Sequence, residues 1–243
     1  MRLDPAAVDA LFLDLGNTLV SMDFVLLTEV LATHGVATTP PALARAEAAT
    51  RPALSRFLAG GRPEWRDTFT FYVDGILERL GGVAATTRAV LAPRLADEIR
   101  RTIPTQRLWS AVLPGVPAAL AALRDAGLRL VVVTNSDGTA EQGLVDRGLR
   151  AHVDHVVDSA VVGAEKPDRA IFQHALAVAG STPERTLDVG DLYAVDVLGA
   201  RAAGLQALLL DPHGDWPDVD CERAPDVPAL ARTLLAGRDA CAR

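Results

Sequence analysis

The sequence is poor in cysteine, and this shortage limits how the chain can be stabilised. Its 243 residues include two cysteines, Cys221 and Cys241, which lie near the C-terminus at a spacing that makes no metal site. Disulfide frameworks are found in oxidising compartments and use several cysteines at regular spacings. We therefore expect both cysteines to remain thiols in a reducing cytoplasm.

A surplus of basic charge is also missing. The chain carries 24 Lys and Arg residues against 31 Asp and Glu residues, which gives a formal net charge of -7. Proteins that bind nucleic-acid backbones displace counterions with a surplus of Lys and Arg. We therefore expect no nucleic-acid partner. A small anionic substrate remains compatible with this charge, because it responds to the groups of its own site.

Long apolar runs are absent as well. No stretch reaches the ~20 residues that a membrane-spanning helix needs, so we expect no membrane contact. The apolar run near the N-terminus contains Asp14 and lacks a basic flank, which argues against a signal peptide. Hydrophobic residues make up 49% and charged residues 23%, as in soluble globular proteins. The length suits one large domain or a domain with an insertion, as a monomer or a homodimer.

Five short apolar runs predict the buried strands of a parallel sheet. Each has about the length of a strand, and most are rich in Val and Leu. The runs are Ala10–Leu15, Arg129–Thr134, His155–Ser159, Thr186–Val189 and Gln206–Leu210. Helical patterns that stop at glycines lie between or beside them, at Val116–Asp125, Gly138–Arg147, Asp168–Ala179 and Ala194–Ala203. Strands that alternate with helices predict an α/β fold with a parallel sheet.

The segment from Phe24 to about Trp109 breaks this alternation and contains only helical patterns. Pro52 and Pro93 fall inside two of them, Pro52 as a candidate kink or break and Pro93 as a candidate break. The simplest interpretation is a helical domain at residues 23–109, inserted into an α/β domain made of residues 1–22 and 110–243. After Pro212 the chain is expected to form a loop and then a short helix near Pro228–Leu235.

Polar residues follow the predicted strands at the points where they end. They are Asp14, Thr134 with Asn135, Lys166, and Asp191 with Asp196. In an open parallel sheet ligands bind beyond the carboxyl ends of the strands, so these residues should converge. Each one alone also has a structural explanation, since Asp caps turns and helix starts, Thr and Asn occur in turns, and a lysine can be solvated.

Taken together, these residues predict phosphoryl transfer. Three neighbouring carboxylates repel one another unless a cation lies among them, and oxygen ligands suit Mg²⁺. A cation at the start of a helix, where Lys166 precedes Pro167, is unfavourable unless it meets an anion such as phosphate. A carboxylate nucleophile, a metal, a lysine and oriented N–H groups are what phosphoryl transfer requires.

The same segments resemble the haloacid dehalogenase superfamily of hydrolases. The matching motifs are Asp14-Leu-Gly-Asn-Thr-Leu, Thr134-Asn135, the segment ending in Glu165-Lys166-Pro167-Asp168, and Gly190-Asp191 with Asp196. All four occur in family order and cover most of the chain outside the helical insertion and the tail. The resemblance implies a Rossmann-like three-layer core, a helical cap and a phosphatase acting on a small phosphorylated substrate.

The resemblance also implies roles for individual residues. Asp14 would be the nucleophile and a Mg²⁺ ligand, together with the Gly16 carbonyl and Asp191. Asp196 would hold water on the metal. Thr134, Asn135 and Lys166 would bind the phosphate, with Lys166 also serving catalysis.

Gly16 departs from the family pattern. Phosphatases of this family usually carry a second Asp at this position, which protonates the leaving group and activates water. Such acid–base help is worth about 10²–10⁴-fold, so its loss should matter most for alkoxide leaving groups. Sugar-1-phosphates and acyl phosphates should depend on it less. Asp23 could replace the missing acid, but its position before an apolar helix favours an N-cap.

Two alternatives remain open from the sequence. A 2-haloacid dehalogenase would use the same Asp without a metal, although Asp191 and Asp196 would repel its carboxylate substrate. A catalytically weakened accessory protein would bind a phosphorylated ligand without turnover. In the helical insertion, Arg51, Arg56, Arg62, Trp65, Arg66 and Tyr72 could contact substrate, although such residues are more often solvated or in the core. The identity of the substrate stays open.

Overall fold

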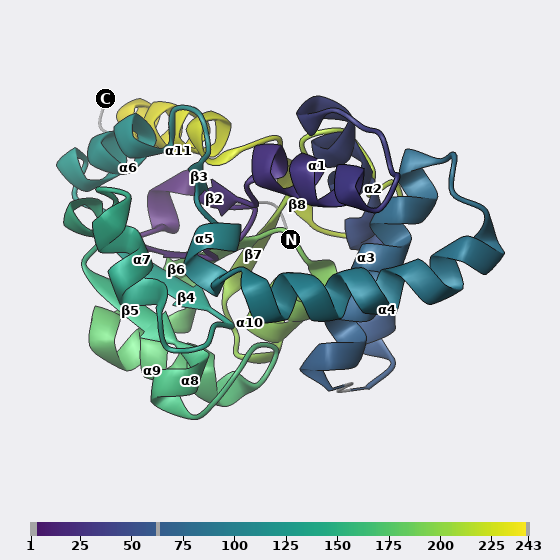
Figure 1. Ribbon diagram of the computed structural model, residues 1–243. Helices are drawn as coiled ribbons and strands as arrows, with labels where there is room; N and C mark the ends of the chain where they lie inside the picture. The colour runs from purple at the N-terminus through teal and green to yellow at the C-terminus, as the bar shows by residue number, and fades with distance from the viewer. Residues whose placement is uncertain (1–3, 62–63, 242–243) are drawn as a thin grey trace. The chain divides into compact units, whose positions relative to one another are not determined.

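The computed structural model describes residues 4–61 and 64–241, which form two compact units (Figure 1). Unit 1 consists of Met1–Ser21 and Ala111–Arg243, and unit 2 of Met22–Ser110. The chain thus leaves unit 1 after its first strands and returns to it once. From the sequence we expected the boundaries of a helical insertion at residues 22/23 and 109/110.

Unit 1 is built on a sheet of six parallel strands. The order is β5-β4-β1-β6-β7-β8, with bounds β1 Ala10–Leu13, β4 Arg129–Thr134, β5 His155–Asp158, β6 Thr186–Gly190, β7 Gln206–Leu210 and β8 Glu222–Ala224. The five expected runs all form strands, and the parallel α/β fold is confirmed. The edge strand β8 was missed, because its residues Glu-Arg-Ala lack an apolar run and lie in the segment expected to be a loop.

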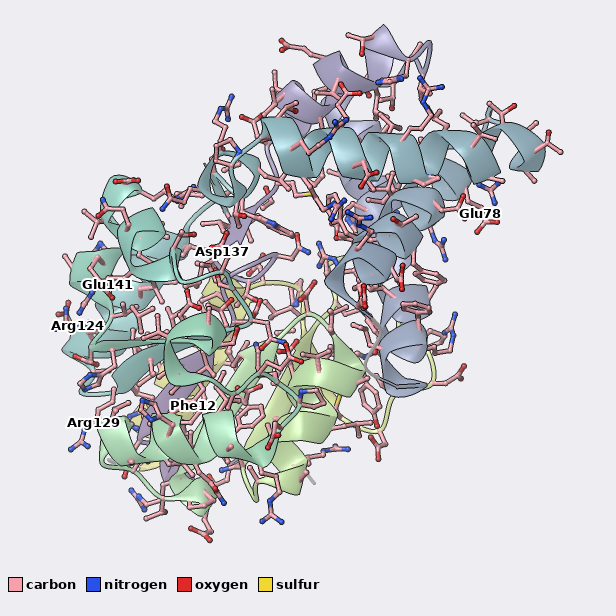
Figure 2. All side chains as sticks on the ribbon, turned by 60° about the horizontal axis from the view of Figure 1, so that its bottom comes forward. Phe12, Glu78, Arg124, Arg129, Asp137 and Glu141 are labelled. Carbon is pink, nitrogen blue, oxygen red and sulfur yellow. The ribbon has the colours of Figure 1, made fainter. Side chains whose placement is uncertain are left out.

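Helices cover both faces of this sheet, which makes three layers (Figure 1). Helices α6 (Val116–Asp125) and α11 (Val227–Cys241) lie together on one face, and α9 (Arg169–Ala179) and α10 (Leu198–Ala202) lie together on the other. Phe12, labelled in Figure 2, is fully buried and packs with Phe172 of α9. Alternating strand residues therefore bury apolar groups on both faces, which holds the strand ends in fixed positions.

Short elements complete unit 1. β2 (Val20–Ser21) and β3 (Ala111–Val112) pair antiparallel where the chain leaves and re-enters the unit. The remaining helical segments are η1 Pro5–Ala7, α7 Ala140–Asp146, η2 Arg150–His152, α8 Ser159–Val162, η3 Pro183–Arg185 and the π-helical turn η4 Tyr193–Val197. Helix α11 is longer than the expected segment Pro228–Leu235.

Unit 2 is entirely helical in its described part. Its helices are α1 Phe24–Thr33, α2 Pro40–Ala59, α3 Trp65–Leu80, α4 Ala85–Thr102 and α5 Thr105–Leu108. Pro52 and Pro93 lie inside continuous helices, so the expected break at Pro93 does not occur and α2 is not interrupted at Pro52. Buried residues flank both prolines, so the packing of these helices offsets the ~3 kcal/mol cost of a proline inside a helix. In residues 4–61 and 64–241, no helix is long and apolar enough to span a membrane.

Candidate active site

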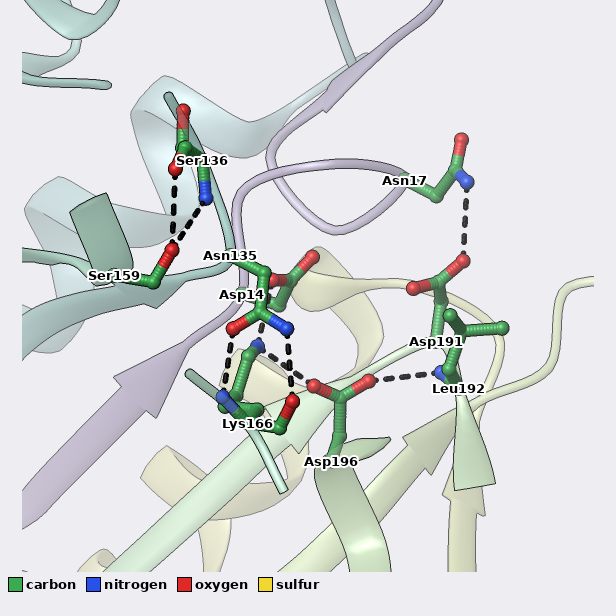
Figure 3. A network of polar contacts seen from close by, with 9 residues as sticks. All are labelled: Asp14, Asn17, Asn135, Ser136, Ser159, Lys166, Asp191, Leu192 and Asp196. Carbon is green, nitrogen blue, oxygen red and sulfur yellow. Dashed lines mark hydrogen bonds and ion pairs between the residues drawn. The ribbon is translucent and has the colours of Figure 1, made fainter. Parts of the chain in front are cut away.

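Three neighbouring strands of unit 1 end at one edge of the sheet and bring the predicted residues together there (Figure 3). β1 lies between β4 and β6, with Leu13 in register with Val132 and Val189. The Asp14 N–H continues this pairing and donates to the Val189 carbonyl at 2.9 Å. Asp14 therefore leaves the sheet beside the ends of the two strands that lead to Thr134 and Asp191.

Lys166 is the only lysine in the chain, and it lies at the centre of this edge. Its side chain is buried, whereas its neighbours Glu165 and Pro167 are exposed. The ammonium donates to Asp14 Oδ1 and to Asp196 Oδ1, both at 2.7 Å. The structure thus excludes the solvated lysine that the sequence left open.

Asp196 is held by several contacts in the turn that follows β6. Its second oxygen, Oδ2, accepts from the Leu192 N–H at 2.8 Å. A Cβ atom on Gly190 would collide with this carboxylate, so only glycine fits at the end of β6. The residue also lies in the π-helical turn η4, a local deviation that is frequent at functional sites. Asp196 is therefore a buried ion-pair partner of Lys166. A favourable charge at the start of a helix would not by itself explain these contacts.

Asp191 is oriented from the β1 side of the edge. Asn17 Nδ2 donates to Asp191 Oδ2 at 3.0 Å, across 174 positions of sequence. Asn17 has a φ of 55°, in the left-handed region that Asn tolerates better than most residues. Its N–H donates to the Val20 carbonyl at 2.5 Å and closes the turn after Asp14. This turn brings the Asn17 amide against Asp191.

The donor atoms at this edge fit a magnesium ion. Asp14 and Asp191 offer carboxylates, and the Gly16 carbonyl accepts no backbone hydrogen bond from the described residues. Within residues 4–61 and 64–241, no three His, Cys, Asp or Glu side chains are arranged to hold a metal by themselves. Two carboxylates and one carbonyl are enough for Mg²⁺, which usually keeps several of its waters.

Burial and neighbouring charges shift the pKa values of Asp14 and Lys166. Burial raises the pKa of Asp14 to about 6, and the charge of Asp196 adds to the effect while Lys166 opposes it. Burial alone would lower the pKa of Lys166, but the charges of Asp14, Asp196 and Asp188 outweigh it and hold this pKa above its ordinary value. Lys166 therefore keeps its proton at neutral pH.

Asp188 is a component of the site that reasoning from the sequence missed. It lies in β6 in register with Phe12, is 2% exposed, and faces the charges of Lys166, Asp196 and Asp14. Burial raises the pKa of Asp188 well above its ordinary value, and the two neighbouring carboxylates add to this effect. The sequence did hold a signal for this residue, since Asp188 is a charged residue inside the predicted buried strand Thr186–Val189. Several carboxyl groups thus surround one ammonium group. A divalent cation would offset the excess of negative charge that these groups carry when they are ionised.

The end of β4 supplies Thr134 and Asn135. Thr134 is buried, and its hydroxyl makes no hydrogen bond with a described residue. The Asn135 side chain bonds instead to the backbone of Lys166, donating to its carbonyl at 2.9 Å and accepting from its N–H at 2.7 Å. The next N–H, that of Ser136, donates to the Ser159 hydroxyl at 3.0 Å.

Several candidates in unit 2 have structural roles. Asp23 caps α1 by accepting from the Leu26 N–H at 2.9 Å, as expected, and also bonds Arg107. Arg51 is buried and bonds both carboxylate oxygens of Glu47, at 2.9 and 2.6 Å, and Tyr72 bonds the same carboxylate. Arg62 and the Trp65 side chain lie outside the described residues.

Comparison with known proteins places these motifs in one family. The family model described as haloacid dehalogenase-like hydrolase matches residues 8–204. The human haloacid dehalogenase-like hydrolase domain-containing protein 3 is 32% identical over 207 residues, which cover 84% of this chain and 82% of that protein. Its bovine counterpart matches over a shorter region, 38% identical over 116 residues, about half of each chain at 48% and 46%.

A named phosphatase and a solved structure are also similar. The phosphoserine phosphatase of Thermus thermophilus is 37% identical over 137 residues, which cover 56% of this chain and 54% of that protein. The crystal structure of the HAD-hydrolase YfnB from Bacillus subtilis bound to magnesium shares the fold, with a TM-score of 0.64 at 20% identity over 93% of this chain and 98% of that one. The chain belongs to the haloacid dehalogenase-like hydrolases.

Proposed function

We propose that the protein is a Mg²⁺-dependent phosphatase that hydrolyses a small phosphorylated metabolite through an aspartyl-phosphate on Asp14. One observation carries the proposal: a buried Lys166 whose ammonium contacts Asp14 at the edge where three strands end. This arrangement combines a nucleophile with positive charge for the oxygens of a phosphoryl group. The similarity to a phosphoserine phosphatase supports this reaction class.

In the first step an oxygen of the Asp14 carboxylate attacks phosphorus, and the bond from phosphorus to the leaving oxygen breaks. The leaving oxygen takes the bonding electron pair. The Lys166 ammonium, the Thr134 hydroxyl and the backbone N–H of Asn135 would bind the phosphoryl oxygens. Asp14, Asp191 and the Gly16 carbonyl would hold Mg²⁺, which when bound would neutralise charge on these oxygens. Asp191 is kept in position by Asn17.

In the second step water attacks phosphorus of the aspartyl-phosphate. The bond from phosphorus to the Asp14 oxygen breaks, its electron pair returns to Asp14, inorganic phosphate leaves, and the proton lost by the water passes to solvent. Asp14 then returns to its carboxylate form. Asp196 and the Leu192 N–H, which are bonded to each other, keep the neighbouring turn in place through both steps.

Gly16 narrows the substrates that this site should favour. It has no side chain that could protonate the leaving oxygen, and Lys166 holds its proton too tightly to donate it. Leaving groups that are stable as anions avoid this need. We therefore infer that a sugar phosphate with its phosphate on the anomeric carbon, or an acyl phosphate, fits better than a simple alkyl phosphate.

A phosphatase screen with and without Mg²⁺ tests the proposal. Sugar phosphates, acyl phosphates, nucleotides and aryl phosphates are assayed for phosphate release, with Asp14→Asn as the control. We expect release that requires both Mg²⁺ and Asp14. Metal-independent halide release from 2-chloropropionate would instead support a dehalogenase. Failure of all substrates despite binding of beryllofluoride with Mg²⁺ would support an accessory protein that binds phosphorylated ligands.

A further inference from the structure

The Asn135 side chain is committed to the backbone of a residue 31 positions away. Its Nδ2 donates to the Lys166 carbonyl at 2.9 Å, and its Oδ1 accepts from the Lys166 N–H at 2.7 Å (Figure 3). A side-chain amide is one of the few groups that offer a donor and an acceptor side by side. Asn135 therefore bonds Lys166 in the way that a neighbouring strand would.

Lys166 needs such a partner because of its position in the chain. It lies between α8 and α9, outside every helix and strand, so its own N–H and carbonyl have no place in a regular ladder. The flanking residues Glu165 and Pro167 are exposed, yet Lys166 itself is buried. A flexible four-carbon side chain can be held between two carboxylates only if its backbone is fixed.

The other side of this segment is fixed by close packing. A Cβ atom on Gly199 of α10 would lie 2.9 Å from the Pro167 Cα, so the missing side chain lets the segment pack directly on the helix. The segment is thus held from one side by α10 and from the other by the Asn135 amide. Between them the Lys166 ammonium reaches Asp14 and Asp196 at 2.7 Å each.

We propose that Asn135 is a positioning residue, which acts on the phosphoryl group through Lys166 and not as a ligand of its own through the side chain. The proposal rests on the proposed phosphatase function and refines the phosphate-binding role expected from the sequence. Asn135 is exposed, so a ligand could reach it. Both polar atoms of its amide nevertheless bond the Lys166 backbone, so its side chain keeps one N–H of Nδ2 beside these two bonds.

Ser159 provides a matched control within the same loop. Its hydroxyl accepts from the Ser136 N–H at 3.0 Å and donates to the Ser136 carbonyl at 3.1 Å, so it fixes the residue next to Asn135 by the same pair of bonds. Ser159→Ala would loosen the loop after β4 without touching Lys166. Effects that appear in Asn135→Ala and not in Ser159→Ala are therefore due to the link with Lys166.

The first test is a double-mutant cycle on the affinity for beryllofluoride with Mg²⁺. Asn135→Ala should weaken binding by roughly 10-fold, the value of one to two hydrogen bonds, and Ser159→Ala should change it little. In a Lys166→Met background, Asn135→Ala should have almost no further effect, because the residue through which it acts is gone. An equal loss in both backgrounds would show an independent ligand and would overturn the proposal.

The second test needs neither ligand nor activity. It tests the proposal even when the Lys166→Met variants do not fold or bind beryllofluoride too weakly to measure. Because Lys166 is the only lysine, protein made with isotope-labelled lysine gives nuclear magnetic resonance signals from this side chain alone. Asn135→Ala should shift or broaden the signals of the Lys166 ammonium and its adjoining carbon in the free protein, while Ser159→Ala leaves them in place. Unchanged side-chain signals in folded Asn135→Ala would overturn the proposal. Failure of the wild type to bind beryllofluoride would instead count against the phosphatase function.

Discussion

The carboxylate of Asp196 fills the space that a Cβ atom on Gly190 would occupy, with Cγ 2.1 Å from that position. This packing explains why β6 ends in glycine and why the turn after it can return Asp196 to Lys166. Gly190 thus contributes to the site by having no side chain, since the position of Asp196 depends on that empty space.

Gly190→Ala should therefore displace Asp196 and break its 2.7 Å bond with Lys166. We expect a loss of stability of about 1–3 kcal/mol, as in other overpacked sites, together with loss of most of the activity. Gly60→Ala is the control, because a Cβ there meets only ordinary contacts at 3.4 Å or more. Urea unfolding and phosphate release measure both effects. Wild-type activity in Gly190→Ala would show that Asp196 is not needed where the structure places it.

Asp188→Asn should stabilise the protein, and more so at high pH. Because the folded state raises the pKa of Asp188, the ionised group opposes folding. The penalty is absent below the ordinary pKa of an Asp and grows as the pH rises toward the folded-state pKa. In metal-free protein, we expect the substitution to add more to the free energy of unfolding at pH 8 than at pH 5. A gain that does not depend on pH would contradict a raised pKa.

Mg²⁺ binding should weaken in mildly acidic solution. Burial raises the pKa of Asp14 to about 6, so below this pH a proton competes with the cation for the carboxylate. We expect the apparent affinity for Mg²⁺ to fall by up to about tenfold per pH unit below pH 6, and to be nearly constant above pH 7. Titration calorimetry between pH 5 and 8 measures this dependence. An affinity that is the same at both ends of the range would exclude Asp14 as the titrating ligand.

Gly16→Asp should change which substrates are turned over. The new carboxyl group could protonate a leaving oxygen, so kcat for alkyl phosphates should rise, by up to about 10²-fold, while kcat for acyl phosphates changes little. Comparing kcat across substrates with different leaving groups, in both proteins, tests this. A wild type that already handles alkyl and acyl phosphates equally well would mean that another residue supplies the proton.

The sequence predicts the sheet well because buried strands have a clear composition. All five apolar runs form strands, whereas β8 escapes notice because its pairing with β7 is decided by the fold and not by its residues Glu222–Ala224. The continuous helices through Pro52 and Pro93 could not be foreseen either, since the packing that stabilises them is tertiary.

The sequence predicts which residues form the candidate site, but it does not predict the hydrogen bonds between them. Strand ends place Asp14 and Asp191 at one edge, because parallel strands share a carboxyl end, and the loop between α8 and α9 brings Lys166 to the same edge. The bonds from Asn17 to Asp191 and from Asn135 to Lys166 join residues far apart in sequence, and no local pattern indicates them. Asp188 was overlooked because its segment was predicted as a buried strand, and that prediction does not say what surrounds the carboxyl group.

Covalent labelling shows whether Asp14 is the nucleophile. The protein is mixed with Mg²⁺ and acetyl phosphate, quenched in acid within one turnover, and examined by mass spectrometry, beside Asp14→Asn as the control. We expect wild-type protein to gain the mass of one phosphoryl group on the peptide that contains Asp14, and the variant to gain none. A phosphoryl group on another residue, or phosphate release that persists in Asp14→Asn, would contradict it.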